Sequence, residues 1–118
     1  MEVNCSISGP CLIAALSGEM DHHSCDSARH IIDDEYHRRG ALHIIFDCAD
    51  INFVDSSGLG LMMGRYRLAS SLGGKVVAVN VSPQLDRILS LSGLYKLIQK
   101  APDRTAAVKM LEGGKHYV

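Results

Sequence analysis

The chain has 118 residues, of which 47% are hydrophobic and 21% are charged, and its formal net charge is −1. That length supports one hydrophobic core, so we expect a single domain over residues 1–118. The balanced charge, without a dense basic cluster, argues against a nucleic-acid partner.

The first elements read as a β-hairpin followed by a helix. Val3–Ser8 alternates apolar and polar residues, Gly9–Pro10 signals a turn, and the apolar run "CLIAALSG" indicates a second strand. Asp21 is a good N-cap for a helix that we expect to continue to Gly40. Its core-facing positions step by three and four residues: Cys25, Ala28, Ile32 and Tyr36.

The middle of the chain predicts a buried strand, a link and a second helix. "ALHIIFD" is a short apolar run typical of a buried strand, and we interpret "DCADINFVD" as an irregular link. A helical period begins at Ser56 and stops at Gly73–Gly74. The stripe expected to face the core is Leu59, Met62, Tyr66 and Ala69.

The last third continues the alternation of strands and helices. "KVVAVN" predicts a buried strand, and Ser82–Pro83 starts a helix that should end at Ser92–Gly93. We expect a short strand near Leu97–Ile98 and a final helix from Pro102–Asp103 to Gly113–Gly114. The order is ββαβαβα, a short β, then α, which predicts an α/β fold with a mixed sheet packed against helices.

The cysteines and the N-terminus point to the cytoplasm. The four cysteines show no C-x-x-C spacing and no zinc-ligand pattern, which favours free thiols. The N-terminus lacks the features of a signal peptide, and no stretch is long and apolar enough to cross a membrane. We therefore expect a cytoplasmic protein without direct membrane insertion.

The segment "FVDSSGLGLMMGRYRLA" places two serines at a helix start. Either serine could cap the helix, or Asp55 could cap it and leave Ser56 and Ser57 in the first turn. A helix start also tolerates anions, so a phosphate on a serine here would add charge without unfolding the domain. A partner packed over the same helix end would meet desolvated charge and dissociate.

Three glycines in this helix need an explanation, because each costs about 1 kcal/mol relative to alanine in a helix. Gly58, Gly60 and Gly64 either allow close packing inside the domain or give a partner access from outside. Leu61 and Leu68 lie off the expected core stripe, so we expect both to be exposed.

Other chemistries fit the sequence poorly. The glycine spacing is G-x-G-x-x-x-G rather than that of a dinucleotide site, no G-K-[ST] is present, and G-x-S-x-G is absent. Asp55 could be a phosphoacceptor, but no acidic pair stands near a strand end to hold magnesium. His30, Asp34 and His37 have metal-ligand spacing on one helix face, yet a solvated face is the better interpretation, so we expect no metal and no cofactor.

"GEMDHHS" and "FVDSSGLG", with "GRY" a turn later, resemble the STAS-domain anti-sigma factor antagonists. The D-S-[ST]-G-L-G core is similar to that of the phosphorylatable members, and G-E-[LM]-D-H-H with G-R-Y is similar to the sporulation branch, which antagonises the anti-sigma F factor. The resemblance spans nearly the whole chain. "GEMDHHS" departs conservatively from the GELDHHT of that branch.

The resemblance implies a binding protein rather than an enzyme. The expected partner is an anti-sigma factor that is also a serine kinase, with its bound ATP or ADP. That kinase would phosphorylate Ser56, and a PP2C-type phosphatase would reverse the modification. The residues expected to form or shape the partner surface are Asp21, Asp55, Ser57, Gly58, Gly60, Leu61 and Gly64. Asp55 and the helix-start amides are expected to position the Ser56 hydroxyl.

Three alternatives are open at this point. The chain could serve another partner-switching system, such as the general stress response. It could be a ligand-sensing STAS module without phosphorylation, or an enzyme that uses Ser56 or Asp55 covalently. The physics of the sequence does not separate Ser56 from Ser57.

Overall fold

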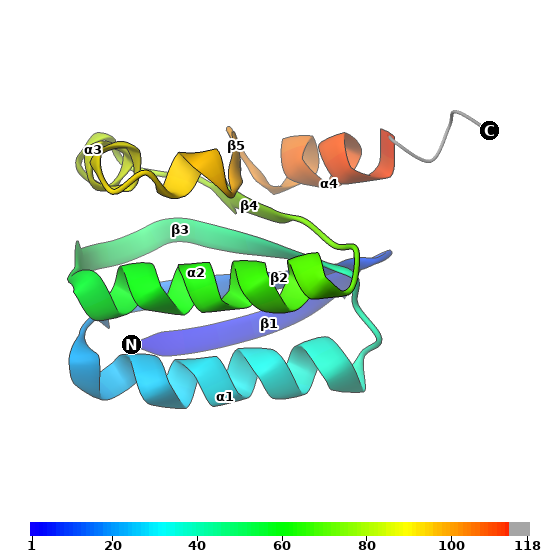
Figure 1. Ribbon diagram of the computed structural model, residues 1–118, viewed down its shortest axis with the longest axis horizontal. Coiled ribbons are helices and arrows are strands. Elements are labelled where there is room, and N and C mark those ends of the chain that lie inside the picture. The colour runs from blue at the N-terminus through cyan, green and yellow to red at the C-terminus, as the bar shows by residue number, and fades with distance from the viewer. Residues whose placement is uncertain (114–118) are drawn as a thin grey trace.

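A five-stranded mixed sheet with helices on both faces forms the protein, as the computed structural model of residues 1–113 shows (Figure 1). Along the chain the elements are β1 (Glu2–Ser8), β2 (Cys11–Met20), α1 (His22–Arg38), β3 (His43–Val54), α2 (Ser56–Ser71), β4 (Val76–Val79), α3 (Pro83–Leu91), the 3-10 helix η1 (Leu94–Lys96), β5 (Gln99–Ala101) and α4 (Arg104–Gly113). This order confirms the predicted fold class.

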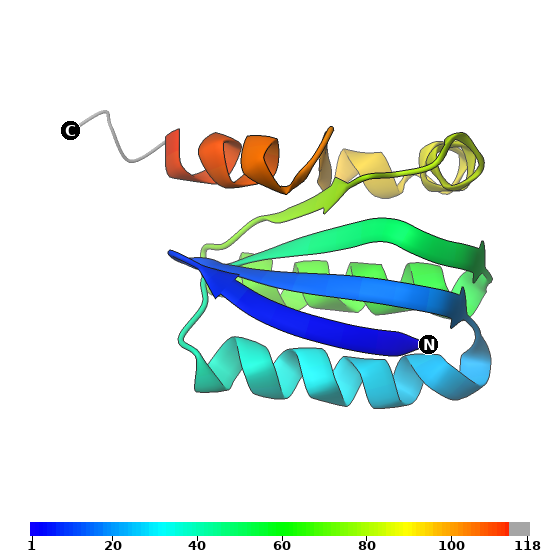
Figure 2. The ribbon, with the colours of Figure 1, turned by 180° about the vertical axis from the view of Figure 1, so that it is seen from behind.

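The strands lie in the order β1-β2-β3-β4-β5, so neighbours in sequence are neighbours in space. β1 pairs antiparallel with β2, and each later pair is parallel. Helices α1 and α2 lie side by side on one face, and no helix lies in front of β1 and β2 when the sheet is seen from behind (Figure 2). Because β2 and β3 are parallel, their carboxyl ends lie at the same end of the sheet, which is where α1 and α2 begin.

Two hydrophobic clusters hold these layers together. The larger one joins the sheet to α1 and α2 and includes the fully buried side chains of Tyr36, Phe46 and Met62. The smaller one joins the other face to α4 and includes Ile45 and Leu111. α1 buries the predicted face, and the Tyr36 hydroxyl donates a 2.7 Å hydrogen bond to the Leu42 carbonyl.

A buried carboxylate anchors α4. Asp47, in the middle of β3, accepts hydrogen bonds from the Asn80 amide at 3.0 Å, the Ala49 amide at 3.1 Å and the Arg104 guanidinium at 2.6 Å. Burial alone would raise the pKa of Asp47, but these hydrogen bonds outweigh burial and hold that pKa below its usual value. The carboxylate thereby stays charged and fixes the start of α4.

The prediction of an irregular link before Ser56 is wrong. β3 continues to Val54, and its second half pairs with the second half of β2, from Ser17↔Asp50 to Met20↔Val54. Two register shifts interrupt this pairing, one between Ala15 and Ser17 and one between Gly18 and Glu19. β-bulges of this kind break the alternation of apolar and polar residues, so the sequence looks irregular where the backbone is extended.

The buried face of α2 is rotated from the predicted stripe. Its buried residues are Gly58, Leu61, Met62, Arg65 and Ala69. Leu59 and Tyr66 are only half-buried, and Leu68 is half-buried rather than exposed. The difference arises because α2 packs against α1 as well as the sheet, which turns the buried arc towards α1.

The end of the chain follows the prediction closely. The Ser82 hydroxyl caps α3 by accepting from the Leu85 amide at 3.2 Å, with Pro83 at the first helical position. The short strand β5 begins at Gln99, two residues later than expected. The amides of Leu97 and Ile98 both donate to the Leu94 carbonyl of η1, so these two residues are in turns rather than in the strand. Gly114, expected to help stop α4, lies outside the described residues.

Gly74, in the loop between α2 and β4, packs against the backbone at Leu42, just before the start of β3. A Cβ atom on Gly74 would lie 1.8 Å from the carbonyl oxygen of Leu42. Because backbone occupies that space, no other residue fits without moving the chain. The C-terminal end of α2 and the N-terminal end of β3 are therefore interlocked.

Candidate functional site

The candidate site lies at the end of the sheet where β2 and β3 finish and α1 and α2 begin (Figure 1). The Asp55 amide donates to the Met20 carbonyl at 3.2 Å, which ties the two strand-to-helix connections together. Residues separated by more than thirty positions in sequence thus share one surface, as the resemblance of "GEMDHHS" and "DSSGLG" implied.

Asp21 caps α1, as predicted. Its carboxylate accepts from the Ser24 amide at 2.9 Å and from the Ser24 hydroxyl at 2.8 Å. The Asp21 amide in turn donates to the Ser24 hydroxyl at 3.4 Å, which completes a capping box. The amide and then the hydroxyl of Ser24 hold the pKa of Asp21 below its usual value. The loop is therefore rigid and negatively charged.

Asp55, and not a serine, caps α2. Its carboxylate accepts from the Ser57 amide at 2.8 Å and from the Gly58 amide at 3.3 Å. Both serines consequently lie in the first turn, which settles the question left by the sequence. The hydrogen bonds of Asp55 go to these two amides, so the expected role of this carboxylate in positioning the Ser56 hydroxyl is not seen.

The two serines differ in their surroundings. Ser56 is the first residue of α2, its side chain is exposed, and its hydroxyl makes no hydrogen bond within residues 1–113. The Ser57 hydroxyl is half-buried and lies 3.4 Å from Nδ1 of His22 on α1. Of these two serines, it is Ser56 that presents an unbonded hydroxyl to solvent.

The three glycines of α2 have different explanations. A Cβ on Gly58 would lie 2.9 Å from the Met20 Cβ, 3.0 Å from the Val54 Cγ1 and 3.2 Å from the Met20 carbonyl. Gly58 is thus required for close packing inside the fold. Cβ atoms on Gly60 and Gly64 would meet nothing within 4 Å, so internal packing does not explain these two glycines.

A shallow groove separates the starts of the two helices. It encloses about 220 Å³ and is lined by His22, Cys25 and Arg29 from α1 and by Ser57, Gly60 and Leu61 from α2. The expectation that Leu61 is exposed is wrong: only 5% of its surface is accessible, because α2 turns this side chain towards α1. Leu61 shapes the wall of the groove rather than projecting from it.

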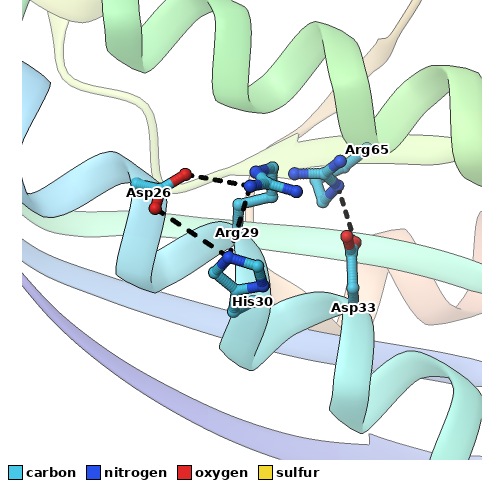
Figure 3. Close-up of polar contacts among 5 residues, drawn as sticks. All are labelled: Asp26, Arg29, His30, Asp33 and Arg65. Atoms are coloured by element: carbon cyan, nitrogen blue, oxygen red, sulfur yellow. Dashed lines mark hydrogen bonds and ion pairs between the residues drawn. The ribbon is translucent and has the colours of Figure 1, made fainter.

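A buried arginine on α2, Arg65, lies between α1 and α2 further along the two helices (Figure 3). The Arg65 Nε is 2.9 Å from Asp33 Oδ1, and Arg29, which pairs with Asp26, lies beside it. The Arg65 Nη1 has no hydrogen-bond partner among the described residues. Burial lowers the pKa of Arg65, and Asp33 opposes that shift.

The burial of Arg65 was not predicted from the sequence. The available signal was spacing, because Arg65 lies three residues after Met62 and four before Ala69. A long charged side chain at a position spaced with buried residues either pairs with an opposite charge or extends along the apolar surface until its charged end reaches solvent. Asp33 on α1 is that partner.

The described residues contain no group of three or more side chains placed to hold a metal ion. No helix among them is long and apolar enough to cross a bilayer. The predicted site residues form one surface around an exposed hydroxyl, with Gly58 and Leu61 beneath it. This arrangement leaves the Ser56 hydroxyl and the positions beside Gly60 and Gly64 open on one face of α2.

Comparison with known proteins agrees with this arrangement. A family model described as the STAS domain matches residues 2–107, so the chain belongs to the STAS domain family. The chain is 40% identical over 101 residues to the anti-sigma F factor antagonist of Paenibacillus polymyxa, which covers 86% of each protein. The resemblance inferred from the sequence is therefore confirmed.

Two solved structures of SpoIIAA share the fold. The unphosphorylated form of this anti-sigma factor antagonist superposes with a TM-score of 0.81 at 26% identity, covering 95% of this chain and 97% of that one. The phosphorylated form of the Bacillus cell fate determinant SpoIIAA gives a TM-score of 0.72 at 26% identity, covering 92% and 99%.

Proposed function

We propose that this protein is an anti-sigma factor antagonist controlled by phosphorylation of Ser56. Its unmodified form binds an anti-sigma factor that is also a serine kinase and so frees the captured sigma factor. The observation that carries the proposal is the exposed, unbonded hydroxyl of Ser56 at the start of α2. The relatives add support, since SpoIIAA has been solved in both a phosphorylated and an unphosphorylated form.

The fold tolerates a phosphate at this position. Ser56 is outside the core, so a phosphate there displaces no packed side chain. The dipole at a helix N-terminus favours negative charge by about 0.3–1 kcal/mol, which offsets part of the repulsion from the Asp55 carboxylate. We therefore expect the modified protein to keep its structure.

A docked partner does not tolerate the same charge. A phosphoserine carries nearly two negative charges, and a surface packed over Ser56 would strip water from them. If the penalty is about 4 kcal/mol, typical of a desolvated unpaired charge, binding weakens about a thousandfold. The switch thus acts on binding while leaving the fold intact.

Some of the remaining site residues are proposed to contact the partner, and others to act through the position of α2. Gly60 and Gly64 leave an open strip on α2 for the partner's backbone. Ser57 lines the same groove as Gly60, and Asp21 holds the start of the neighbouring helix α1. Gly58, Leu61 and Asp55 act indirectly, by fixing how α2 begins. The ATP or ADP and the catalytic groups belong to the kinase, and a PP2C-type phosphatase restores the free hydroxyl.

Incubation with an anti-sigma F factor and Mg-ATP, followed by intact-mass measurement, tests the modification. We expect one added phosphate on the wild type and on Ser57→Ala, and none on Ser56→Ala. Phosphate on Ser56→Ala but not on Ser57→Ala would move the site to Ser57. No phosphate on any form would contradict control by phosphorylation.

Binding measurements by calorimetry test the consequence. Ser56→Ala should bind as the wild type does, whereas Ser56→Asp should fold normally and bind at least tenfold more weakly. Wild-type affinity in Ser56→Asp would count against the mechanism. Parallel titrations with an anti-sigma F and an anti-sigma B factor test the proposed sporulation branch, for which we expect tighter binding to the former.

A further inference from the structure

β3 extends well past its neighbour β4. The pairing of the two strands ends at Asp47↔Val79, but β3 continues to Val54. Residues 48–54 of β3 are therefore held by β2 on one side only. In the described part of the chain, no backbone hydrogen bond joins residues 48–54 to the segment 80–88 that follows β4. This stretch of β3 is an open strand edge.

A groove runs along this open edge, between β3 and α3. It encloses about 220 Å³, and its apolar lining consists of Ile51, Phe53 and Val54 from β3 and Leu85 and Ile88 from α3. The polar residues Asn52, Ser82 and Gln84 complete the lining. For scale, an engineered cavity of about 150 Å³ accommodates benzene. The groove therefore has room for a branched or aromatic side chain beside an extended backbone.

The apolar side chains at the rim of the groove are exposed to an unusual degree. Phe53 is 52% exposed and Ile88 is 36% exposed, although both are large and hydrophobic. The register shift near Gly18 and Glu19 falls opposite this part of β3 and disturbs its alternation, so both Asn52 and Phe53 face solvent. Exposed apolar groups that border a cavity mark an interaction surface.

We propose that an extended segment of the anti-sigma factor adds as a strand to the edge of β3, with an apolar side chain between Phe53 and Ile88. This inference rests on the proposed function, because it names how that same partner docks. An open edge offers backbone N–H and C=O groups in the pattern that an extended chain satisfies, and the groove beside it selects a side chain.

The position of the edge favours the same partner that meets Ser56. Val54 lines the groove and is followed directly by Asp55, the cap of α2, and then by Ser56. A chain lying along residues 51–54 therefore reaches the phosphorylated position within a few residues. The buried centre of such an interface carries most of the binding energy, so the groove is expected to contain a hot spot.

Two pairs of matched variants test the side-chain part of the proposal against an anti-sigma F factor of Paenibacillus polymyxa. Ile88→Glu alters the groove, whereas Leu91→Glu makes a comparable change on the same helix at a residue that is 81% exposed and does not line it. Phe53→Ser and Leu72→Ser form the second pair, since Leu72 is 56% exposed at the far end of α2. All four side chains are exposed enough for the fold to be retained.

We expect Ile88→Glu and Phe53→Ser to weaken binding at least tenfold, and their controls to change it less than twofold. Amide hydrogen exchange tests the backbone part, because strand addition should slow exchange at residues 49–54 in the complex. Unchanged affinity in both groove variants, or unchanged exchange at these amides, would overturn the proposal while wild-type binding still supported the proposed function. Failure of the wild type to bind would overturn both.

Discussion

Replacing Gly58 by alanine should destabilise the protein, although the same change at Gly60 should stabilise it. The added Cβ at Gly58 would lie 2.9 Å from the Cβ of Met20 and 3.0 Å from the Cγ1 of Val54. The Met20 Cβ is fixed to its backbone, so no side-chain rotation relieves that contact. The start of α2 would have to move away from the ends of both strands.

The expected size of the effect follows from two opposing contributions. Forcing a methyl group into a packed core costs about 1–3 kcal/mol, and the rigid contact with Met20 favours the upper end of that range. Replacing a helical glycine by alanine returns about 1 kcal/mol. The net loss at Gly58 is then about 2 kcal/mol, whereas Gly60→Ala gains about 1 kcal/mol because its Cβ meets nothing within 4 Å.

Urea unfolding of the wild type and of the two variants measures this difference directly. We expect the urea midpoint to be lowest for Gly58→Ala, intermediate for the wild type and highest for Gly60→Ala. The free energies of unfolding of the two variants should differ by about 3 kcal/mol. Gly64→Ala should match Gly60→Ala, since its Cβ also meets open space. A Gly58→Ala protein as stable as the wild type would refute the close-packing explanation for this residue.

Three further outcomes are expected. Asp33→Ala should lower the free energy of unfolding by about 3 kcal/mol, since it leaves the Arg65 charge buried and unpaired, and adding Arg65→Met should recover most of that loss in urea melts. Because the folded pKa of Asp47 is depressed, its contribution to stability is present above the unfolded pKa of about 3.9 and is lost as pH falls through the folded pKa. Melts at pH 7 and pH 3 should therefore differ less for Asp47→Asn than for the wild type. Burial raises the pKa of the Cys48 thiol to about 12, so thiol reagents at neutral pH should modify half-exposed Cys5 first and reach Cys48 only on unfolding.

Local signals in the sequence predicted most of the fold. The caps at Asp21 and Ser82 are short-range patterns, and the structure contains both. The buried face of α1 follows a simple period of three and four residues because nearly all other residues of that helix are polar. Where the apolar residues of an element form one stripe, periodicity in the sequence is enough.

The errors occurred where the apolar residues of an element do not form one stripe. α2 carries apolar residues on several sides, and Leu61 and Arg65 are buried although neither belongs to the expected stripe. The second half of β3 contains bulges whose position depends on pairing with β2, and no local pattern encodes that pairing. Periodicity identifies one stripe, and it is ambiguous when apolar residues lie on several sides of a helix or when strand pairing sets the register.

The residues of the candidate site were proposed from the sequence, whereas their geometry is known only from the structure. Sequence pattern and resemblance singled out Asp55, Ser56 and Ser57 together, yet only the structure shows that Asp55 occupies the capping position and leaves one hydroxyl free. Likewise, the sequence could not assign different roles to Gly58 and Gly60, because the closest contact of Gly58 comes from Met20 at the end of β2, far away in the chain.

The contact at Gly74 has a counterpart at the other end of α2. A Cβ on Gly74 would lie 1.8 Å from the Leu42 carbonyl oxygen, so the loop that follows α2 packs directly on the backbone just before β3. In the first turn of α2, Gly58 packs in the same way against Met20 and Val54. Because backbone contacts hold both ends of this helix, we expect a docking partner to meet α2 as a rigid body, with Ser56 at a fixed position.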